Sequence, residues 1–552
     1  MSSLIPKSSC RTLQAMHSIS FNLASITPET RVGELTLIRP GGQTITIPTP
    51  GLITSTSRGV VPHLSRDHCQ STEAIRWANI PFETFLEQSP PIPTYQTGPH
   101  PLHKFLGYDP SRNLLSMSIR DPHDGREMPP NGQNHISAYC VRGVRKVTSS
   151  DWRSHVEKCK PDVVFAMSDI PFTPPPYSQK RTTKSLERSA AWLVDILRPS
   201  DNGVHEGEEH VAQPNVIVHM AGGASIPARK AFAETLAEAL YAKEAELLKP
   251  LKHLNDGILG YVFDLVPLRL SLKTENTISD VVGDDDLDQG NTTRPIRAQI
   301  ADFIPLLKAS LAPLPESKVR LVNSTSCPHE VLQFIRDIGV DLFDAHWAQR
   351  AADIGVALDF KFPFGEESLD TLQQAHGKRD IGHNLYDTRY ALDFSRLASC
   401  FLDGASATDL ATACPCAACS PSAPTSHISH SLLDSFAKVE GSRILPPYTR
   451  AYLHHLLHTH EMSSHTLLVM HNITVLDAFF AGIRSVLSQE NGKERFVTEV
   501  ARFEKEYDEK LTVFDQARVL WAEVERARGK GRLAREKAKQ NETTLGTAVE
   551  LE

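Results

Sequence analysis

The sequence predicts an α/β protein built on a parallel sheet, and the pattern alone leaves open whether that sheet closes into a barrel. Short apolar segments alternate with amphipathic ones through the middle of the chain, which is the order typical of strands joined by helical crossovers. The strand segments are apolar on both faces, as strands covered by helices require. The expected strands are 162–167, 215–219, 257–263 and 319–323, and the expected helices are 184–197, 228–248 and 328–338.

The composition is that of a globular chain with room for several domains. Its 552 residues include 58 Lys and Arg against 66 Asp and Glu, which gives a net charge of −8, and 40% of them are hydrophobic. No run approaches roughly 18 consecutive apolar residues, so the sequence predicts no transmembrane helix. The acidic balance argues against a protein that holds nucleic acid by bulk charge. Any RNA contact must therefore be local or shared with a partner.

The N-terminal region predicts a leader followed by a β-hairpin. The first 28 residues contain no Asp or Glu, several Ser, and the cations Lys7 and Arg11. We expect a disordered leader there, with a mitochondrial presequence as the alternative interpretation. Residues 34–38 and 43–48 then alternate apolar and polar side chains around the turn Pro40–Gly42, as the two strands of a hairpin do.

Three segments have the composition of surface insertions, namely 171–176, 275–290 and 420–447. After Gln489 the pattern becomes a long, charged helix whose end is basic. That end is either a solvated tail or an arm that contacts phosphates. Its cations are Arg526, Arg528, Lys530, Arg532, Arg535, Lys537 and Lys539, against the single acid Glu536.

Three cysteines predict a metal site. Cys414, Cys416 and Cys419 have the spacing Cys-x-Cys-x2-Cys, so their thiolates can fill three corners of a tetrahedron around Zn²⁺. A closed site of three cysteines and one histidine has no open position for water, which would make its role structural.

The fourth ligand is open at this point. Several histidines follow the cysteines, and His454 and His458 share one face of a helix. His471 follows a buried-looking apolar run and would present its ring from a fixed backbone. Spacing alone permits either choice.

Other features carry weaker predictions. Residues 221–226 lie between a strand and a helix, where a phosphate loop can sit, but they lack the spacing and the lysine of a P-loop. Asp169 follows the strand 162–167 and is interpreted as a cap of the next element. Tyr452 and His455 lie three residues apart on one helix, where they either pack the cysteine region or face a partner.

The order of motifs around the cysteines resembles a known family. The motif comprises Cys414-x-Cys416-x2-Cys419, Thr449-Arg-Ala-Tyr-Leu-His-His-Leu456, Glu461 and His471-Asn472. It resembles the zinc subdomain of the tRNA-guanine transglycosylases, which are irregular (β/α)8 barrels that exchange a guanine at the tRNA wobble position for queuine or a precursor. The likeness extends over residues 30–490.

The resemblance implies one Zn²⁺ per subunit, held by Cys414, Cys416, Cys419 and His471. It also implies the fold class: an irregular (β/α)8 TIM-type barrel with an inserted zinc-binding subdomain and a C-terminal helical tail. The expected domains are a disordered leader at 1–29, the barrel at 30–400, the zinc-binding subdomain closing the barrel at 401–490, and a charged helical tail with a basic end at 491–552.

The chain departs from the family where the chemistry is carried. Catalytic members have an Asp-Ser-Gly-Gly-Phe-Gln stretch early in the barrel, whereas this chain reads Leu115-Ser-Met-Ser-Ile-Arg-Asp-Pro-His-Asp-Gly125. Their base-recognition strand corresponds here to Gly257-Ile-Leu-Gly-Tyr-Val-Phe-Asp264. Asp344 stands at the position of the nucleophile, and without its pocket we interpret it as a relic of the ancestral site.

These losses resemble the accessory, non-catalytic subunits of the eukaryotic members. The resemblance implies no catalysis by this chain itself, a heterodimer with a catalytic queuine tRNA-ribosyltransferase subunit, and help in binding tRNA with a wobble guanine. The cytoplasm is the default location for this chain, which has no predicted integral membrane segment, and the resemblance adds peripheral attachment to the mitochondrial outer membrane. The alternative is an active transglycosylase that uses Asp344 as its nucleophile.

Overall fold

A computed structural model of the chain describes residues 14–15, 18–26, 31–39, 42–173, 175–199, 212–272, 300–364, 377–399, 414–424 and 442–528. The contacts between residues divide the chain into two compact units. Among the described residues, those up to 347 and those of 476–503 form the first unit, and those of 348–475 and 504–528 form the second.

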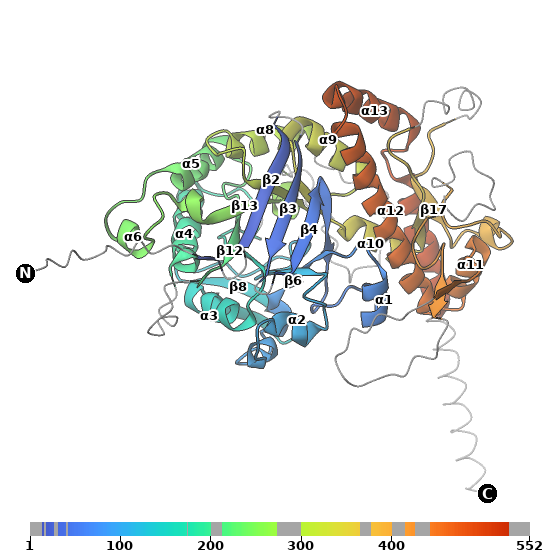
Figure 1. Ribbon diagram of the computed structural model, residues 1–552, viewed down its shortest axis with the longest axis horizontal. Helices are drawn as coiled ribbons and strands as arrows, with labels where there is room; N and C mark the ends of the chain where they lie inside the picture. Colours follow the sequence, from blue (N-terminus) through green and yellow to red (C-terminus); the bar gives the residue numbers. More distant parts are fainter. Residues whose placement is uncertain are drawn as a thin grey trace, which may run out of the picture. The chain divides into compact units, whose positions relative to one another are not determined.

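The first unit is built around a closed barrel of parallel strands (Figure 1). The strand pattern alone did not distinguish an open sheet from a barrel, and the structure has the barrel. Neighbouring strands follow the order β10, β12, β13, β14, β15, β5, β6 and β7. The four predicted strands are confirmed as β10, β12, β13 and β14. The bounds are β5 Gly51–Ser55, β6 Trp77–Pro81, β7 Leu114–Ser118, β10 Val163–Phe165, β12 Asn215–His219, β13 Ile258–Asp264, β14 Val319–Asn323 and β15 Leu342–Asp344.

Helices follow most of the barrel strands along the chain. Their bounds are α1 Arg66–Ser71, α2 Pro101–Leu106, α3 Ser149–Cys159, α4 Gln179–Leu197, α5 Ile226–Ala237, α6 Ala242–Leu247, α7 Leu265–Leu272, α8 Ile300–Leu311 and α9 Pro328–Ile338. The single helix expected at 228–248 is wrong, because it is broken into α5 and α6. The backbone N–H of Leu240 donates to the carbonyl of Lys252 at 2.8 Å, so this turn bonds to a distant segment instead of continuing the helix.

A three-stranded antiparallel sheet precedes the barrel. It contains β2 (Ser18–Ile26), β3 (Arg31–Ile38) and β4 (Thr44–Thr49), and β3 with β4 confirms the predicted hairpin. The expectation of a disordered leader is wrong for Ser18–Ile26, because this stretch pairs with β3 along its whole length. The two-residue strands β1 (Gln14–Ala15) and β11 (Ala212–Gln213) also pair, in parallel.

Two buried arginine–aspartate pairs hold this sheet against the starts of barrel strands. Arg31 donates from Nε and Nη2 to Asp341, just before β15, at 2.9 Å each. Arg39 donates from Nη2 to Asp162, just before β10, at 2.8 Å. Leu35, Leu37, Ile45 and Ile47 from β3 and β4 join one core with the barrel residues, among them Trp77 and Leu114.

A β-hairpin is inserted between β7 and α3. It consists of β8 (His135–Cys140) and β9 (Gly143–Thr148), paired antiparallel. Ile136, Ala138 and Val147 of this hairpin are buried, whereas its turn and much of β9 face solvent. These buried side chains anchor the hairpin, while its turn and the cations Arg145 and Lys146 of β9 remain exposed.

The second unit contains two small antiparallel sheets and helices. Its strands are β16 (Val356–Leu358) paired with β17 (Gly382–Asn384), and β18 (Ser422–Pro424) paired with β19 (Ser442–Ile444). Helix α11 spans Arg450–His458, and residues 512–528 are helical. The boundaries between the units fall in or beside α10 (His346–Asp353), α12 (Ser463–Leu487) and α13 (Gly492–Glu506).

These boundaries differ from the expected domain limits, because the last barrel strand already ends at Asp344 and the second unit begins at Ala348. The acidic insertion at 275–290, residues 425–441 of the insertion at 420–447, and the basic end after Arg528 lie outside the described residues.

Helix α12 is long and apolar enough to cross a membrane by length and composition, with a mean hydropathy of 1.5 over its most apolar window. Within the protein, 67% of that window is buried. Core helices of globular proteins share these properties, so the helix carries no argument for a membrane span.

The buried pair between Arg39 and Asp162 yields a prediction for stability. Asp162→Ala should lower the free energy of unfolding by about 3–5 kcal/mol, because it leaves Arg39 buried without a counter-charge. Urea unfolding followed by circular dichroism measures the change. Glu234→Ala, which removes an exposed pair with Lys230, is the control and should cost less than about 1 kcal/mol. Equal losses in the two variants would contradict the assignment.

Candidate functional site

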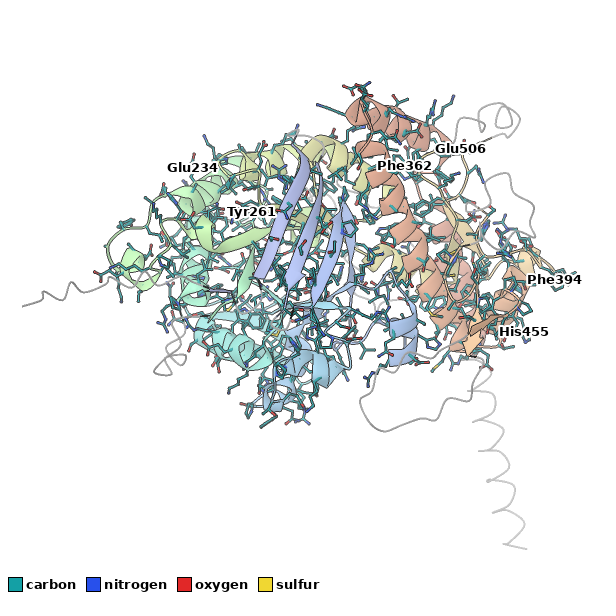
Figure 2. The ribbon with its side chains drawn as sticks, viewed as in Figure 1. Glu234, Tyr261, Phe362, Phe394, His455 and Glu506 are labelled. Carbon is teal, nitrogen blue, oxygen red and sulfur yellow. The ribbon has the colours of Figure 1, made fainter. Side chains whose placement is uncertain are left out.

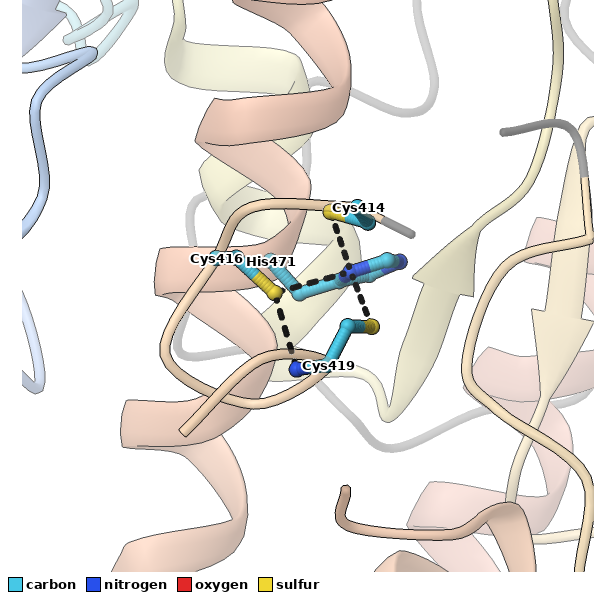
Figure 3. A group of neighbouring side chains, drawn as sticks. All are labelled: Cys414, Cys416, Cys419 and His471. Carbon is cyan, nitrogen blue, oxygen red and sulfur yellow. Dashed lines mark hydrogen bonds between the residues drawn. The ribbon is translucent and has the colours of Figure 1, made fainter. Parts of the chain in front are cut away.

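Four side chains of the second unit converge on one buried point (Figure 3). Cys414, Cys416 and Cys419 lie on the short loop before β18, and His471 projects from α12. Their four ligand atoms lie within 4.8 Å of one another, and all four residues are buried. The structure thus brings together the four residues that the resemblance implied as metal ligands.

The distances in this cluster fit a tetrahedral metal ion. The Nδ1 atom of His471 lies 3.7 Å from the sulfur of Cys414, 3.4 Å from that of Cys416 and 3.5 Å from that of Cys419. Metal–sulfur and metal–nitrogen bonds of about 2.3 and 2.05 Å at tetrahedral angles place sulfur and nitrogen about 3.6 Å apart. The donor set therefore fits a metal ion without rearrangement.

The neighbouring backbone orients the histidine. The Nε2 atom of His471 lies 2.9 Å from the carbonyl of Leu358 in β16. A proton on Nε2 donates to that carbonyl and leaves Nδ1 with a free lone pair facing the sulfurs, as metal-binding histidines require. Asn472 accepts from the N–H of Leu358 at 2.9 Å and donates to the carbonyl of Val356 at 3.0 Å. Both residues of the His-Asn pair thus fix α12 to β16.

The charges in the cluster favour a cation at its centre. The sulfurs of Cys414 and Cys416 hydrogen-bond to Cys419 and hold the pKa of that thiol well below its ordinary value. Burial lowers the pKa of His471, but the sulfurs of Cys419 and Cys416 outweigh burial and raise it well above its ordinary value. Positive charge is therefore stabilised between Nδ1 and the sulfurs.

The other candidate histidines lie on backbone carbonyls. His454 contacts the carbonyl of Leu385 at 2.8 Å, and His458 contacts that of Tyr386 at 3.1 Å. Neither belongs to the metal-binding group found among the described residues. Of these histidines, His471 is the one whose ring nitrogen lies with the three cysteine sulfurs among the described residues.

Asp344 lies at the end of β15 in the first unit, where its carboxylate is enclosed. The side chain is 3% exposed. It accepts hydrogen bonds from the N–H of His346 at 3.0 Å and from the N–H of Ser324. The Nε2 atom of His123 lies 3.3 Å from Oδ2 of Asp344. Each carboxylate oxygen thus already has a partner within the protein.

His123 forms a fixed cation beside Asp344. Its Nδ1 atom lies 2.8 Å from Asp121, and its ring stacks on that of His346 with the centroids 3.7 Å apart. Burial lowers the pKa of His123, but the carboxylates of Asp344 and Asp121 outweigh burial and raise that pKa to about 10. His123 is therefore an imidazolium at neutral pH.

Two other carboxylates at the carboxyl ends of barrel strands are also paired. Asp169 accepts from both Nη atoms of Arg181 at 2.8 and 2.7 Å, and from Arg188 at 3.0 Å. The interpretation of Asp169 as a cap is wrong, because Ser178 caps α4 and the buried carboxylate is drawn to the arginines. Asp264 lies 2.7 Å from the Nδ1 atom of His219 and accepts from Asn323 at 2.8 Å.

Glu83 ties two loops to the end of β6, a role with no signal in the sequence. Its carboxyl accepts from the N–H of Asp121 at 2.7 Å and from that of Tyr139 at 2.9 Å. Burial raises the pKa of Glu83 to about 7, although both hydrogen bonds oppose the shift. The residue holds the loop of His123 and the hairpin β8–β9 in register.

Two cavities of very different volume lie at the mouth of the barrel. A cavity of about 40 Å³ is lined by Asn79, Arg120, Asp121 and Asp264, among others. A second cavity of about 620 Å³ lies between the loops that follow β10, β12 and β13, including Gly222 and Gly223 of the loop noted in the sequence. Asp344 does not belong to the described residues that line either of these two cavities.

A family model described as Queuine tRNA-ribosyltransferase matches residues 27–245 and 294–507. The chain belongs to the queuine tRNA-ribosyltransferase family. Curated relatives within this family carry the name Queuine tRNA-ribosyltransferase accessory subunit 2. That of Schizosaccharomyces pombe is 25% identical over 461 residues, covering 83% of this chain and 78% of the relative. The human protein is 24% identical over 497 residues, covering 86% and 97%. The Xenopus laevis protein is 24% identical over 497 residues, covering 88% and 99%.

The metal centre yields a prediction for content and stability. We expect the purified protein to hold about one metal ion per chain, and Cys416→Ser to lose it and to unfold at a temperature lower by on the order of 10 °C. Elemental analysis and thermal unfolding measure both effects. Cys69→Ser, at a half-buried thiol outside the cluster, should keep the ion. A metal-free protein of undiminished stability would contradict a structural metal centre.

Glu83 yields a prediction for pH dependence. Its pKa is about 7 in the folded protein against 4.5 for an ordinary Glu, so the folded state binds the proton more tightly. Stability from this group is present at acidic pH and is lost as the pH rises through 7, by about 3 kcal/mol in all. Glu83→Gln should remove this loss. The free energy of unfolding of the variant, measured in urea, should therefore rise relative to that of the wild type between pH 5 and pH 8.5. A difference that does not change with pH would refute the assignment.

Proposed function

We propose that this chain is the accessory, non-catalytic subunit of a heterodimeric queuine tRNA-ribosyltransferase. In this role it binds the catalytic subunit and tRNA with a wobble guanine, and it supports exchange of guanine for queuine without chemistry of its own. Family membership and the accessory-subunit relatives support the proposal. The observation that carries it is the buried contact between His123 and Asp344.

Base exchange needs a carboxylate that can reach the ribose. The attacking oxygen must come within about 3–3.5 Å of the sugar carbon C1′. In this chain His123, His346 and Ser324 occupy the surroundings of the Asp344 oxygens. His123 belongs to residues 115–125, the stretch that departs from the catalytic motif. The stretch that lacks the catalytic motif therefore also supplies the cation that covers the nucleophile position.

The size of the adjacent space supports the same conclusion. A cavity of about 40 Å³ is close to the volume of one water molecule, about 30 Å³, and far below the roughly 300 Å³ of typical ligand pockets. A purine has no room in this small cavity beside Asp121. The larger cavity of about 620 Å³, which Asp264 also lines, does not have Asp344 in its lining, so a base held there would not contact the nucleophile position. The alternative of an active transglycosylase that uses Asp344 is therefore not favoured.

For the metal centre we propose Zn²⁺ in a structural role. Three thiolates and one imidazole nitrogen at tetrahedral distances are the donor set that zinc prefers. Four protein ligands leave no position for water, so the ion would join the cysteine loop to α12 and take no part in a reaction. Cys414, Cys416, Cys419 and His471 would hold it.

An exposed group of apolar side chains on the second unit is our proposed contact for the catalytic subunit. This aromatic patch consists of Leu392, Phe394, Tyr448 and Tyr452. Leu392 is 81% exposed, Phe394 73% and Tyr452 44%. The rings of Tyr448 and Tyr452 stack with centroids 5.6 Å apart. Exposed aromatic clusters of this kind mark protein interfaces.

The aromatic patch is held together by the start of α11. The N–H of Arg450 donates to the carbonyl of Ser395 at 3.1 Å, and that of Ala451 to the carbonyl of Asp393 at 2.7 Å. Figure 2 labels Phe394 and, on the same helix as Tyr452, His455. Both residues that the sequence marked on this helix, Tyr452 and His455, are exposed. We therefore propose that they face the partner.

For location we propose the cytoplasm, with peripheral attachment to the mitochondrial outer membrane. The support is the resemblance to eukaryotic accessory subunits. Fractionation of cells followed by a salt wash of mitochondria tests it, and protein that resists the wash as an integral component would contradict it.

Exchange of labelled guanine into a wobble-guanine tRNA tests the function. We expect no exchange by this chain alone, and exchange by its mixture with the catalytic subunit. Asp344→Asn should leave the exchange rate of the mixture within about twofold. The outcome that would refute the proposal is exchange by the isolated chain that Asp344→Asn abolishes. Circular dichroism and complex formation by the variant establish that it is folded.

The aromatic patch yields a prediction for assembly. Phe394→Ser should weaken binding to the catalytic subunit by about tenfold or more, because truncating a central aromatic anchor costs more than about 1 kcal/mol. Analytical ultracentrifugation measures the affinity. Tyr241→Ser, at a ring that is 76% exposed in the first unit, is the matched control and should bind as the wild type does. Equal effects of the two changes would place the interface elsewhere.

A further inference from the structure

We propose that a basic surface on the first unit binds the phosphate backbone of the tRNA. This hairpin–α4 surface consists of Arg142, Arg145 and Lys146 on the hairpin β8–β9, and Lys180, Lys184 and Arg188 on α4. The inference rests on the proposed function, because that function supplies the tRNA. It goes beyond that function by naming where the RNA is held.

The hairpin contributes three solvent-facing cations. Arg142 lies at the turn, and Arg145 and Lys146 follow on β9; all three are exposed. Lys146 stands opposite Ser137, so it shares a face of the hairpin with His135 and Tyr139. The opposite side of the hairpin packs inward through Ile136, Ala138 and Val147. The three cations do not share one face of the ribbon, because Arg145 stands opposite Ala138 and Lys146 opposite Ser137. All three nevertheless reach solvent from a ribbon that the protein holds in place.

Helix α4 contributes a stripe of cations that meets the hairpin. Lys180, Lys184 and Arg188 are spaced four residues apart, so they lie along one face of the helix. Lys180 and Lys184 are exposed. Arg188 donates to the carbonyl of Asn131 at 3.2 Å and to Gln133 at 3.3 Å, directly before β8. The stripe and the hairpin are thus joined at Arg188.

The local potential at this junction is positive. The pKa of His135 is lowered by its burial and by the neighbouring charges of Lys146 and Arg188. No carboxylate among the described residues contributes to this shift. Asp169 binds Arg181 and also Arg188, so Arg188 is already paired with a carboxylate at the edge of this surface. Asp124 binds Arg126. Glu187 is the exposed acid next to the stripe.

Flat side chains lie beside the cations. The guanidinium of Arg126 sits over the ring of Tyr139 at 4.2 Å, and that of Arg120 over the ring of Phe172 at 4.8 Å. Rings and guanidinium planes offer stacking surfaces for unpaired bases, while lysines and arginines contact phosphates. This combination favours a nucleic acid over an acidic protein, whose interface would need an apolar centre.

The net negative charge of the chain strengthens the case for this basic surface. The chain carries a net charge of −8, so bulk attraction does not bring RNA to it. A local group of five exposed cations on the ribbon and the helix stripe, joined by the paired Arg188, is what such a chain needs for a phosphate contact. Such a surface would be local, as the composition requires of any RNA contact.

The experiment uses the complex of this chain with the catalytic subunit. The variant carries Arg142→Gln, Arg145→Gln and Lys146→Gln, and the control carries Lys243→Gln and Lys249→Gln, both exposed near α6. Fluorescence anisotropy measures binding of a wobble-guanine tRNA between about 50 and 300 mM salt. Over this range the Debye length falls from about 14 Å to about 6 Å, so contacts between charges are progressively screened. We expect about tenfold weaker binding by the variant, and a slope of log affinity against log salt that is smaller by about 2, because about 0.7 to 0.9 is lost per phosphate contact. The control should match the wild type.

The outcomes are distinguishable. If the triple variant binds tRNA as tightly as the wild type and with the same dependence on salt, this inference is overturned and the proposed function stays intact. A wild-type complex that neither binds tRNA nor exchanges guanine overturns both. A parallel titration with phosphatidylcholine vesicles that contain phosphatidylserine tests whether the surface binds an anionic membrane. If the triple variant loses vesicle binding but keeps tRNA binding, the assignment of the surface to RNA is overturned. Unchanged assembly with the catalytic subunit establishes that the variant is folded.

Discussion

A carboxylate buried at the end of a barrel strand requires a positive or donating partner, because an uncompensated buried charge costs several kcal/mol. In this barrel Asp169, Asp264 and Asp344 each find such partners within the chain. A barrel that binds a substrate turns such groups toward an open mouth, where the substrate meets them. Here the protein's own histidines and arginines take that place. Under the proposed function, the contacts that stabilise these buried carboxylates would also keep them from a substrate.

The regular parts of the fold could be predicted because their residues carry the signal themselves. Strands β10 and β12 are apolar throughout, and α9 repeats its apolar residues at helical spacing, so burial and period agree. Three cysteines within six positions have few uses other than a metal. Strand β2 was missed although Ile19, Phe21 and Leu23 alternate with polar residues in it, because the lack of acidic residues over the first 28 positions favoured a leader; its pairing with β3 shows the strand. The break between α5 and α6 was equally hidden, since it depends on a hydrogen bond to Lys252, far along the chain.

The barrel mouth could not be predicted for a different reason. His123 lies in an irregular loop, and nothing in Pro122-His123-Asp124 indicates that its ring reaches Asp344. Glu83 acts on the backbone N–H groups of Asp121 and Tyr139, which any side chain at those positions would present. Contacts of this kind follow from the path of the loops. The sequence could show that the catalytic motif was missing, but the structure was needed to show what stands in its place.

The pairing of β18 with β19 has a consequence for how this protein can change in length. Ser422–Pro424 lies against Ser442–Ile444, so the chain leaves the cysteine loop and returns at the same place before α11 begins. The N–H of Leu445 donates to the carbonyl of Pro421 at 2.8 Å and extends this closure toward the cysteines. Closing a longer segment between two fixed ends costs only about 0.6 kcal/mol for each doubling of its length. Insertions and deletions between these strands can therefore accumulate with little penalty, and an epitope or a fluorescent reporter is best grafted there.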